Sequence, residues 1–178
     1  MNKPAQFGFT IIELMAVVLI ASILIMVAIP SFTSFVINNR MTTEANSLVT
    51  SLQVARSEAV KRNSSVYVGS TNGSGNWDQG FVIFLDTNSN GAYNAGTDTV
   101  IRQQNAMASD VLKASIGGTA APLLQYLPTG FIGNLAGGSM TFNLCHQANY
   151  AGRQIIVNSV GQVSLNDSCT CNASNQCN

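Results

Sequence analysis

Two hydrophobic patterns follow one another in the N-terminal third of the chain. Residues 14–29 are apolar apart from Ser22, and residues 9–12 extend this stretch towards the N-terminus. A helix over residues 9–29 would be about 31 Å long, which matches the hydrocarbon core of one bilayer. The first pattern therefore predicts a single membrane-crossing helix over residues 9–29.

The second pattern lies beyond Pro30, where the chain becomes more polar but keeps a helical period. Apolar residues recur there every three or four positions, which places them on one face of a helix: Met41, Ala45, Leu48, Leu52, Ala55 and Ala59. Charged residues fall mainly on other faces, and the polar residues from Asn63 end the pattern. We expect an amphipathic helix over residues 31–62 that packs on the protein's own sheet. A two-stranded coiled coil is the alternative, but the stripe is short for one.

Residues 63–178 carry short β-rich runs separated by Gly, Asn, Ser and Pro. The runs are Val66–Val68, Phe81–Leu85, Thr99–Arg102, Val111–Ile116, Leu123–Leu127, Met140–Leu144, Gln154–Asn158 and Gln162–Leu165. They predict an antiparallel domain of about eight strands. The expected fold class is α+β, with a long N-terminal helix packed on a small β-sandwich-like head.

Composition and charge narrow the function classes. The 178 residues suffice for one domain with an appendage. Lys+Arg and Asp+Glu both number 8, so no overall field draws the chain to nucleic acid. We find no nucleophile signature and no phosphate-binding glycine loop, so we expect neither an enzyme nor a cofactor.

Glu13 is a carboxylate inside the first apolar stretch, with no basic residue one helical turn away. An unpaired charge at membrane depth costs about 2.5 to 3.5 kcal/mol, so a partner is expected. A cut between Gly8 and Phe9 would create an α-amino group on Phe9, and this group on a neighbouring subunit could pair with Glu13. A cleaved secretory signal is the alternative, but the apolar run is longer than usual and no clean cleavage site follows it.

The string GFTIIELM over residues 8–15 resembles the prepilin cleavage and methylation motif of type IV pilins and type II secretion pseudopilins. The resemblance implies that prepilin peptidase removes a leader of residues 1–8 after Gly8 and N-methylates Phe9. It also implies that Glu13 takes part in processing and subunit docking. Pro30 falls where many such helices carry a proline, and we expect a helix break there.

Three further segments resemble the pseudopilin H and FimT/FimU minor-pilin group: residues 55–62, 77–86 and 152–155. This pilin-like resemblance implies a minor subunit that helps to initiate assembly at the filament tip, together with other minor and major pilins or pseudopilins. It implies a single-pass anchor in the inner membrane of a Gram-negative bacterium, with a periplasmic head over residues 63–178. A type IV pilus and a type II secretion pseudopilus both remain open.

The four cysteines are Cys145, Cys169, Cys171 and Cys177, an even number in a head expected outside the cytoplasm. Disulfides are therefore predicted. A bond between Cys169 and Cys171 is sterically poor, so Cys145 bonds to one of them and Cys177 to the other. We prefer Cys171 with Cys177 and Cys145 with Cys169. The alternative is a zinc site of Cys169, Cys171, Cys177 and either Cys145 or His146, but C-x-C is not the usual zinc spacing.

Two other features have a chemical and a structural interpretation. Residues 86–91 match the first half of a Ca²⁺ loop, but position twelve is Thr97 and the closing carboxylate is missing, so we expect a polar loop and no metal. His146 is the only histidine, and we expect it at a strand end.

DNA binding in natural transformation is the alternative function, because some FimT-like subunits are thought to bind DNA through a C-terminal Gly-Arg-x-Arg motif. The matching positions, residues 161–164, contain no arginine. Arg153 remains as a candidate DNA contact, although we expect it to pair locally at a strand edge.

Overall fold

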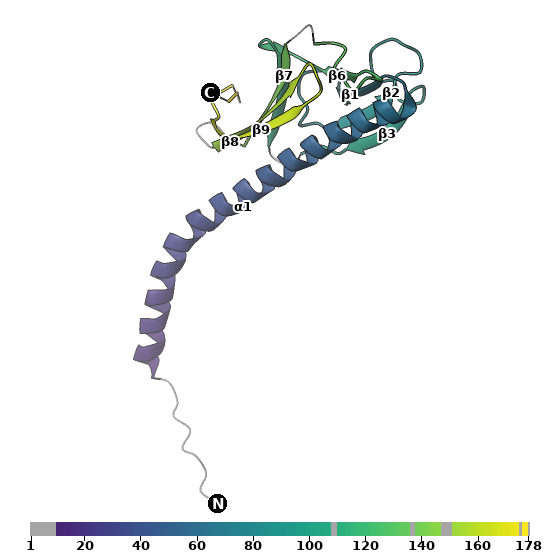
Figure 1. Ribbon diagram of the computed structural model, residues 1–178. Coiled ribbons are helices and arrows are strands. Elements are labelled where there is room, and N and C mark those ends of the chain that lie inside the picture. The colour runs from purple at the N-terminus through teal and green to yellow at the C-terminus, as the bar shows by residue number, and fades with distance from the viewer. Residues whose placement is uncertain (1–9, 108–109, 136–137, 147–150, 175, 178) are drawn as a thin grey trace, which may run out of the picture. The chain divides into compact units, whose positions relative to one another are not determined.

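The computed structural model describes residues 10–107, 110–135, 138–146, 151–174 and 176–177 (Figure 1). One compact unit ends at Asn39 and a second, the head, begins at Arg40. In the described residues the elements are α1 (Ile11–Arg62), β1 (Val66–Ser70), β2 (Phe81–Leu85), β3 (Thr99–Gln104), β4 (Val111–Ile116), β5 (Thr119–Ala120), β6 (Leu123–Tyr126), β7 (Ser139–Cys145), β8 (Ala151–Asn158) and β9 (Val163–Thr170).

The strands form two antiparallel sheets. The first has the order β3-β2-β1-β6 and the second the order β5-β4-β7-β8-β9. Val68 on β1 lies between Ile83 and Leu124, and Phe142 on β7 lies between Ala114 and Ile155. The eight predicted runs all correspond to strands, and the structure adds the two-residue strand β5.

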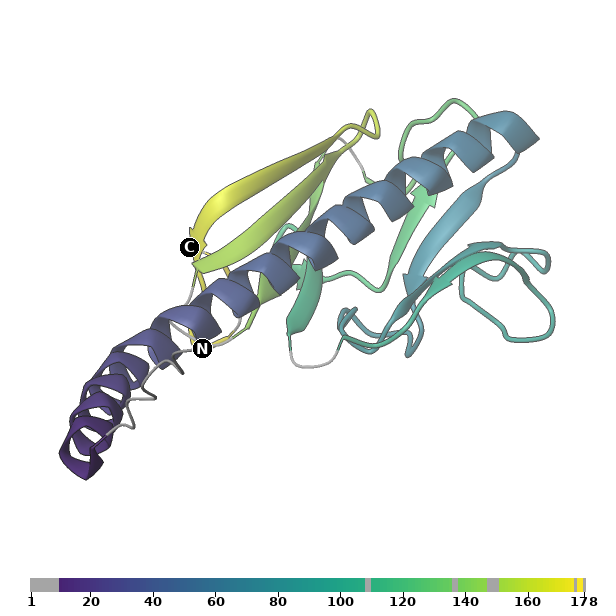
Figure 2. The ribbon, with the colours of Figure 1, turned by 90° about the horizontal axis from the view of Figure 1, so that it is seen from below.

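The part of α1 within the head packs on both sheets. All six residues of the predicted apolar stripe, from Met41 to Ala59, are at most 1% exposed. Figure 2 shows this part of α1 crossing the strands. Arg56 on α1 donates hydrogen bonds to loops that follow a strand of each sheet. Its Nε donates to the carbonyl of Gly130, which follows β6, and its Nη2 to that of Val160, between β8 and β9. The amphipathic prediction is confirmed, and the stripe packs within the chain.

Trp77 joins the two sheets in the core. Its ring lies 5.9 Å from that of Phe81 on β2 and 4.9 Å, edge to face, from that of Phe142 on β7. The indole Nε1 donates to the carbonyl of Ala121 over 3.0 Å, which satisfies its one polar group.

The predicted end of α1 is also confirmed. Asn63 adopts a φ of 49°, in the left-handed region. Its amide donates to the carbonyl of Val60, and the amide of Ser64 donates to that of Ala59. These bonds satisfy carbonyls that the last helical turn would leave without partners.

The expected helix break at Pro30 is wrong, because α1 continues without interruption from Ile11 to Arg62. A proline has no backbone N–H, so it removes one hydrogen bond to the carbonyl four residues earlier. In a helix this long the bonds of the preceding and following turns hold the backbone, and the loss of one does not end the helix.

Candidate functional site: the apolar segment and the head contacts

The first part of α1 exposes its apolar side chains. Ile11 is 81% exposed, Met26 78% and Phe35 62%. An 18-residue window of α1 has a mean hydropathy of 2.9 and none of it is buried, so α1 is long and apolar enough to cross a membrane. Because exposed apolar surface is unfavourable in water, this segment requires an apolar partner from outside the chain.

Glu13 lies in the first turn of α1, where Thr10 is the N-cap. The Thr10 hydroxyl accepts a hydrogen bond from the Glu13 amide over 3.3 Å. The Thr10 carbonyl accepts a hydrogen bond from the Leu14 amide over 3.1 Å. Thr10 and Glu13 therefore have the spacing of a capping box, and a carboxylate here interacts favourably with the helix dipole. The Glu13 side chain is exposed at the start of the helix.

The other residues of the predicted processing site, Gly8 and Phe9, lie outside the described residues. Their expected roles in leader cleavage and N-methylation, and the pairing of Glu13 with the Phe9 amine, stay predictions. Each of these roles involves a second protein, either the peptidase or a neighbouring subunit.

Four polar residues, which we call the Arg40 cluster, join α1 to the strands: Arg40, Glu44, Asp110 and His146. Arg40 donates from Nε to Asp110 Oδ2 over 2.9 Å and from Nη2 to Oδ1 over 2.8 Å. His146 Nδ1 lies 2.7 Å from the same Oδ1, and the Asp110 side chain is fully buried. A buried carboxylate is stable only with such partners, so the cluster fixes the start of the head's helix.

The two carboxyl groups of the Arg40 cluster have pKa values that depart from their ordinary range in opposite directions. Burial raises the pKa of Glu44 to about 7, and the negative charge of nearby Asp110 acts in the same direction. Burial also acts to raise the pKa of Asp110, but hydrogen bonds from Arg40 and His146 outweigh it and lower that pKa. At neutral pH the cluster thus contains one firmly ionised carboxylate and one that is partly protonated.

The cysteines form two disulfides, Cys145–Cys171 and Cys169–Cys177, with Cα–Cα distances of 5.9 Å and 5.2 Å. Disulfide formation is confirmed, but the preferred pairing is wrong and the alternative partition is the one found. A turn at residues 173–174 follows Cys171, and the Asn172 amide donates a hydrogen bond to the Gln176 carbonyl. This turn brings the Cys177 side chain to Cys169, while Cys171 lies buried beside Cys145. No thiolate is left among the four cysteines for the alternative zinc site.

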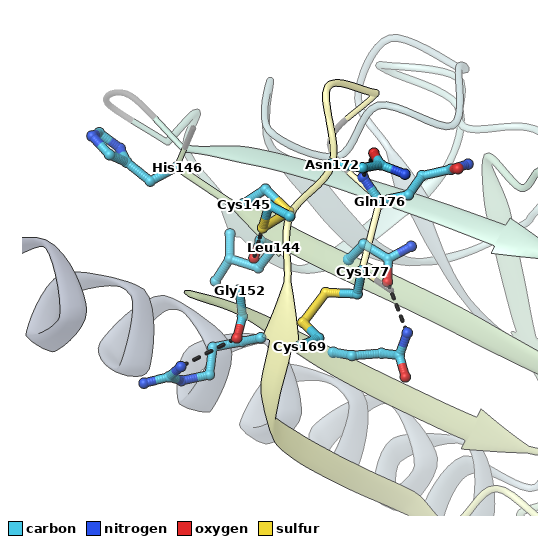
Figure 3. Close-up of a disulfide and its surroundings, with 12 residues drawn as sticks. Leu144, Cys145, His146, Gly152, Cys169, Asn172, Gln176 and Cys177 are labelled. Atoms are coloured by element: carbon cyan, nitrogen blue, oxygen red, sulfur yellow. Dashed lines mark hydrogen bonds between the residues drawn. A yellow bond between two sulfur atoms is a disulfide. The ribbon is translucent and has the colours of Figure 1, made fainter. Parts of the chain in front are cut away.

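Gly152 on β8 makes room for the two disulfides (Figure 3). A Cβ atom at this position would lie 2.5 Å from the sulfur of Cys171, 3.0 Å from that of Cys169 and 3.1 Å from that of Cys177. Because these distances are shorter than van der Waals contact, the packing of the sulfurs requires glycine here.

The loop between β2 and β3 is a polar hairpin loop, as expected. The Asp86 carboxylate accepts hydrogen bonds from the amides of Asn90 and Gly91. The Asp98 carboxylate accepts hydrogen bonds from the amides of Thr87 and Asn94. Both carboxylates are therefore used to hold the loop backbone in place.

Comparison with known families decides the class of the protein. The model of the prokaryotic N-terminal methylation motif matches residues 3–29, and the model of the type II transport protein GspH matches residues 44–161. The chain belongs to the GspH family. The match covers most of the head, and the methylation motif covers the exposed apolar segment with Glu13. No curated protein matches the sequence.

Solved structures with the same fold include a type IV minor pilin and a minor pseudopilin. The minor pilin FimU of Pseudomonas aeruginosa PAO1 has a TM-score of 0.58 and 21% identity, covering 71% of this chain and 92% of that chain. The minor pseudopilin EpsH of the Vibrio cholerae type 2 secretion system has a TM-score of 0.53 and 15% identity, covering 72% and 97%. The pilin-like fold expected from the sequence is confirmed.

Arg153, the candidate DNA contact, interacts within this GspH-family head. It lies on β8, and its Nη1 donates to the carbonyl of Gly152 over 3.2 Å. Its Nη2 lies 3.4 Å from the Thr42 hydroxyl on α1, and its Nε is buried. These contacts agree with local pairing and give no specific support to DNA binding.

The Arg40 cluster is not predicted from the sequence. The sequence shows Arg40 only as one of the charged residues outside the apolar stripe and predicts His146 only at a strand end. The local signal is weak, since only Arg40 and Glu44 have helical i, i+4 spacing. Asp110 and His146 are 70 and 106 residues away from Arg40 in sequence.

Proposed function

We propose that this GspH-family protein is a minor pilin or pseudopilin that helps to initiate assembly at the tip of a type IV pilus or a type II secretion pseudopilus. The observation that carries the proposal is the exposed apolar start of α1, on which Glu13 is the only charged residue before Arg40. Prepilin peptidase removes residues 1–8 after Gly8 and N-methylates Phe9. The subunit has a structural role and is not an enzyme.

The location follows from the same segment. Before assembly the helix over residues 9–29 holds the subunit in the inner membrane, with the head, including its strand-bearing residues 63–178, in the periplasm. During assembly the helix moves from lipid into a bundle of like helices. Both surroundings are apolar, so the transfer changes little hydrophobic free energy, and specificity comes from polar contacts.

The polar contact in this proposal joins Glu13 to the α-amino group of Phe9 on a neighbouring subunit. A hydrogen bond between charged groups contributes more than one between neutral groups, and both partners lack water in the bundle. The helix from Ile11 onwards has no other charged group in its apolar part that could serve this purpose.

The test uses the full chain in cells that carry their own assembly system, with Glu13→Ala as the variant. We expect the variant to reach the membrane and to begin at Phe9, measured by mass spectrometry, but its content in sheared filaments to fall about tenfold or more. Gly8→Ala should retain residues 1–8 and separate failed processing from failed docking.

Ser22→Ala is the matched control, because the Ser22 hydroxyl donates to the Leu19 carbonyl of its own helix over 2.7 Å. Removing it should leave incorporation unchanged. Normal filament content of the Glu13→Ala protein would contradict the pairing, and an N-terminus at Phe9 in the Gly8→Ala protein would contradict the processing site.

A further inference from the structure

The Arg40 cluster connects three segments that are distant in sequence. Asp110 directly precedes β4 and His146 directly follows β7, and the neighbouring residues Val111 and Cys145 are paired across these strands. Both side chains therefore lie at the same end of two adjacent strands. Arg40 reaches them from α1, so the cluster fastens the first helical turns of the head to the second sheet.

The cluster has two carboxyl groups but one guanidinium, and Asp110 already binds that guanidinium through both oxygens. Glu44 lies one helical turn after Arg40, and its Oε2 is buried without a partner among the described residues. An ionised Glu44 would place a second negative charge beside Asp110. A protonated Glu44 would be neutral and could donate a hydrogen bond to Asp110.

We propose that the Arg40 cluster is a proton-dependent latch, which holds residues 40–48 of α1 against β4 and β7 when Glu44 is protonated and loosens when Glu44 is ionised. This is a property of the head, and it holds whether or not the chain works in a filament.

The direction of the response follows from linkage between protonation and stability. The pKa of Glu44 in the folded protein, about 7, is above its ordinary value. The latch therefore stabilises the folded head fully at acidic pH, and this stabilisation is lost as the pH rises through about 7. Asp110 has a lowered pKa, so it stays ionised over this range and supplies the charge that Glu44 would meet.

The charged groups around Glu44 come from its own helix and from the strands packed against that helix. Arg40 and Glu44 lie on α1, Asp110 precedes β4 and His146 follows β7. Since an ionised carboxylate only accepts hydrogen bonds, His146 Nδ1 carries the hydrogen in its 2.7 Å contact with Asp110. Arg153 on β8 adds a cation next to the same helical turns through its contact with Thr42.

Amide hydrogen exchange of the detergent-solubilised full chain tests the proposal, after correction for the pH dependence of the intrinsic rates. The amides of residues 41–48 should lose protection by about tenfold between about pH 6 and about pH 8.5, while β2 stays protected. In Glu44→Gln, which is neutral at every pH, this difference should disappear.

Glu58→Gln is the matched control, because Glu58 lies on the same helix and pairs with Arg62 over 2.6 Å at the surface. This variant should keep the pH response of residues 41–48. The fluorescence of Trp77 checks that each variant is folded, and Glu44→Ala serves as a second neutral variant if Glu44→Gln does not fold.

Two outcomes would overturn the latch. One is equal protection of residues 41–48 at both pH values in the unmodified protein. The other is a pH response that persists in the neutral Glu44 variants and disappears in His146→Gln, which would assign the response to the imidazole.

Discussion

The two parts of α1 have the same backbone conformation and opposite surroundings. Up to Phe35 the large apolar side chains are mostly exposed, whereas Met41, Leu48 and Leu52 are at most 1% exposed. In the first part apolar residues occur all around the helix, and in the second they are restricted to one stripe with polar residues elsewhere. A helix apolar on all sides needs an apolar environment on all sides, and the head provides one only for a stripe.

This difference indicates how each part is stabilised. The stripe beyond Arg40 is buried by the protein's own sheets, so its contribution belongs to the folding of the head. Under the proposed function, the segment up to Asn39 is stabilised by lipid or by other helices, so substitutions there should affect location and assembly more than folding.

The strongest test of this comparison replaces one leucine in each part. Leu48 is 1% exposed, so Leu48→Ala should lower the free energy of unfolding of the head by about 3 kcal/mol, through lost burial and a cavity. Leu19 is 64% exposed, so Leu19→Ala should change the free energy of unfolding by less than about 0.5 kcal/mol. Denaturant unfolding in detergent, monitored by the fluorescence of Trp77, gives both values. Equal losses in the two variants would refute the distinction.

A second test concerns the part of the head that contains the two disulfides. Gly152→Ala places a methyl group among three sulfur atoms, so we expect a loss of about 1 to 3 kcal/mol and incomplete disulfide formation. Denaturant unfolding and thiol titration measure the two effects. Gly138→Ala is the control, because a Cβ there would meet no atom within 4 Å, and it should be neutral. A neutral Gly152→Ala would show that the sulfurs have space to move.

The helix, its buried stripe and eight of the strands were predictable because each depends on the local period of apolar residues. The strand β5 was not, since two residues carry no period. The disulfide pairing depended on the turn at residues 173–174, beyond which Cys177 bonds to Cys169. The spacing of cysteines along the chain does not contain that geometry.

The candidate sites divide in the same way. The motif around Gly8, Phe9 and Glu13 could be found from the sequence, because its residues lie in one contiguous segment, which a family model also matches. The Arg40 cluster could not, because its members come from three distant segments that only the folded head brings together. The proposed roles of the first group depend on other molecules, whereas the contacts of the second lie within the head itself.

The smallest expected effect on stability concerns a buried polar group in the head. Tyr126 on β6 is fully buried, and its hydroxyl has no partner among the described residues. Burial raises the pKa of Tyr126, consistent with a site that disfavours charge. Tyr126→Phe removes this hydroxyl without changing the ring, so we expect a stabilisation of up to about 1 kcal/mol by denaturant unfolding.

Tyr67→Phe on the adjacent strand β1 is the matched control for Tyr126→Phe. The Tyr67 hydroxyl accepts a hydrogen bond from Gln125 Nε2 over 3.0 Å, so its removal should cost about 1 kcal/mol. The two substitutions delete the same atom from neighbouring strands and should therefore have opposite signs. A loss of stability in Tyr126→Phe as large as that in Tyr67→Phe would mean that the buried hydroxyl is hydrogen-bonded in solution.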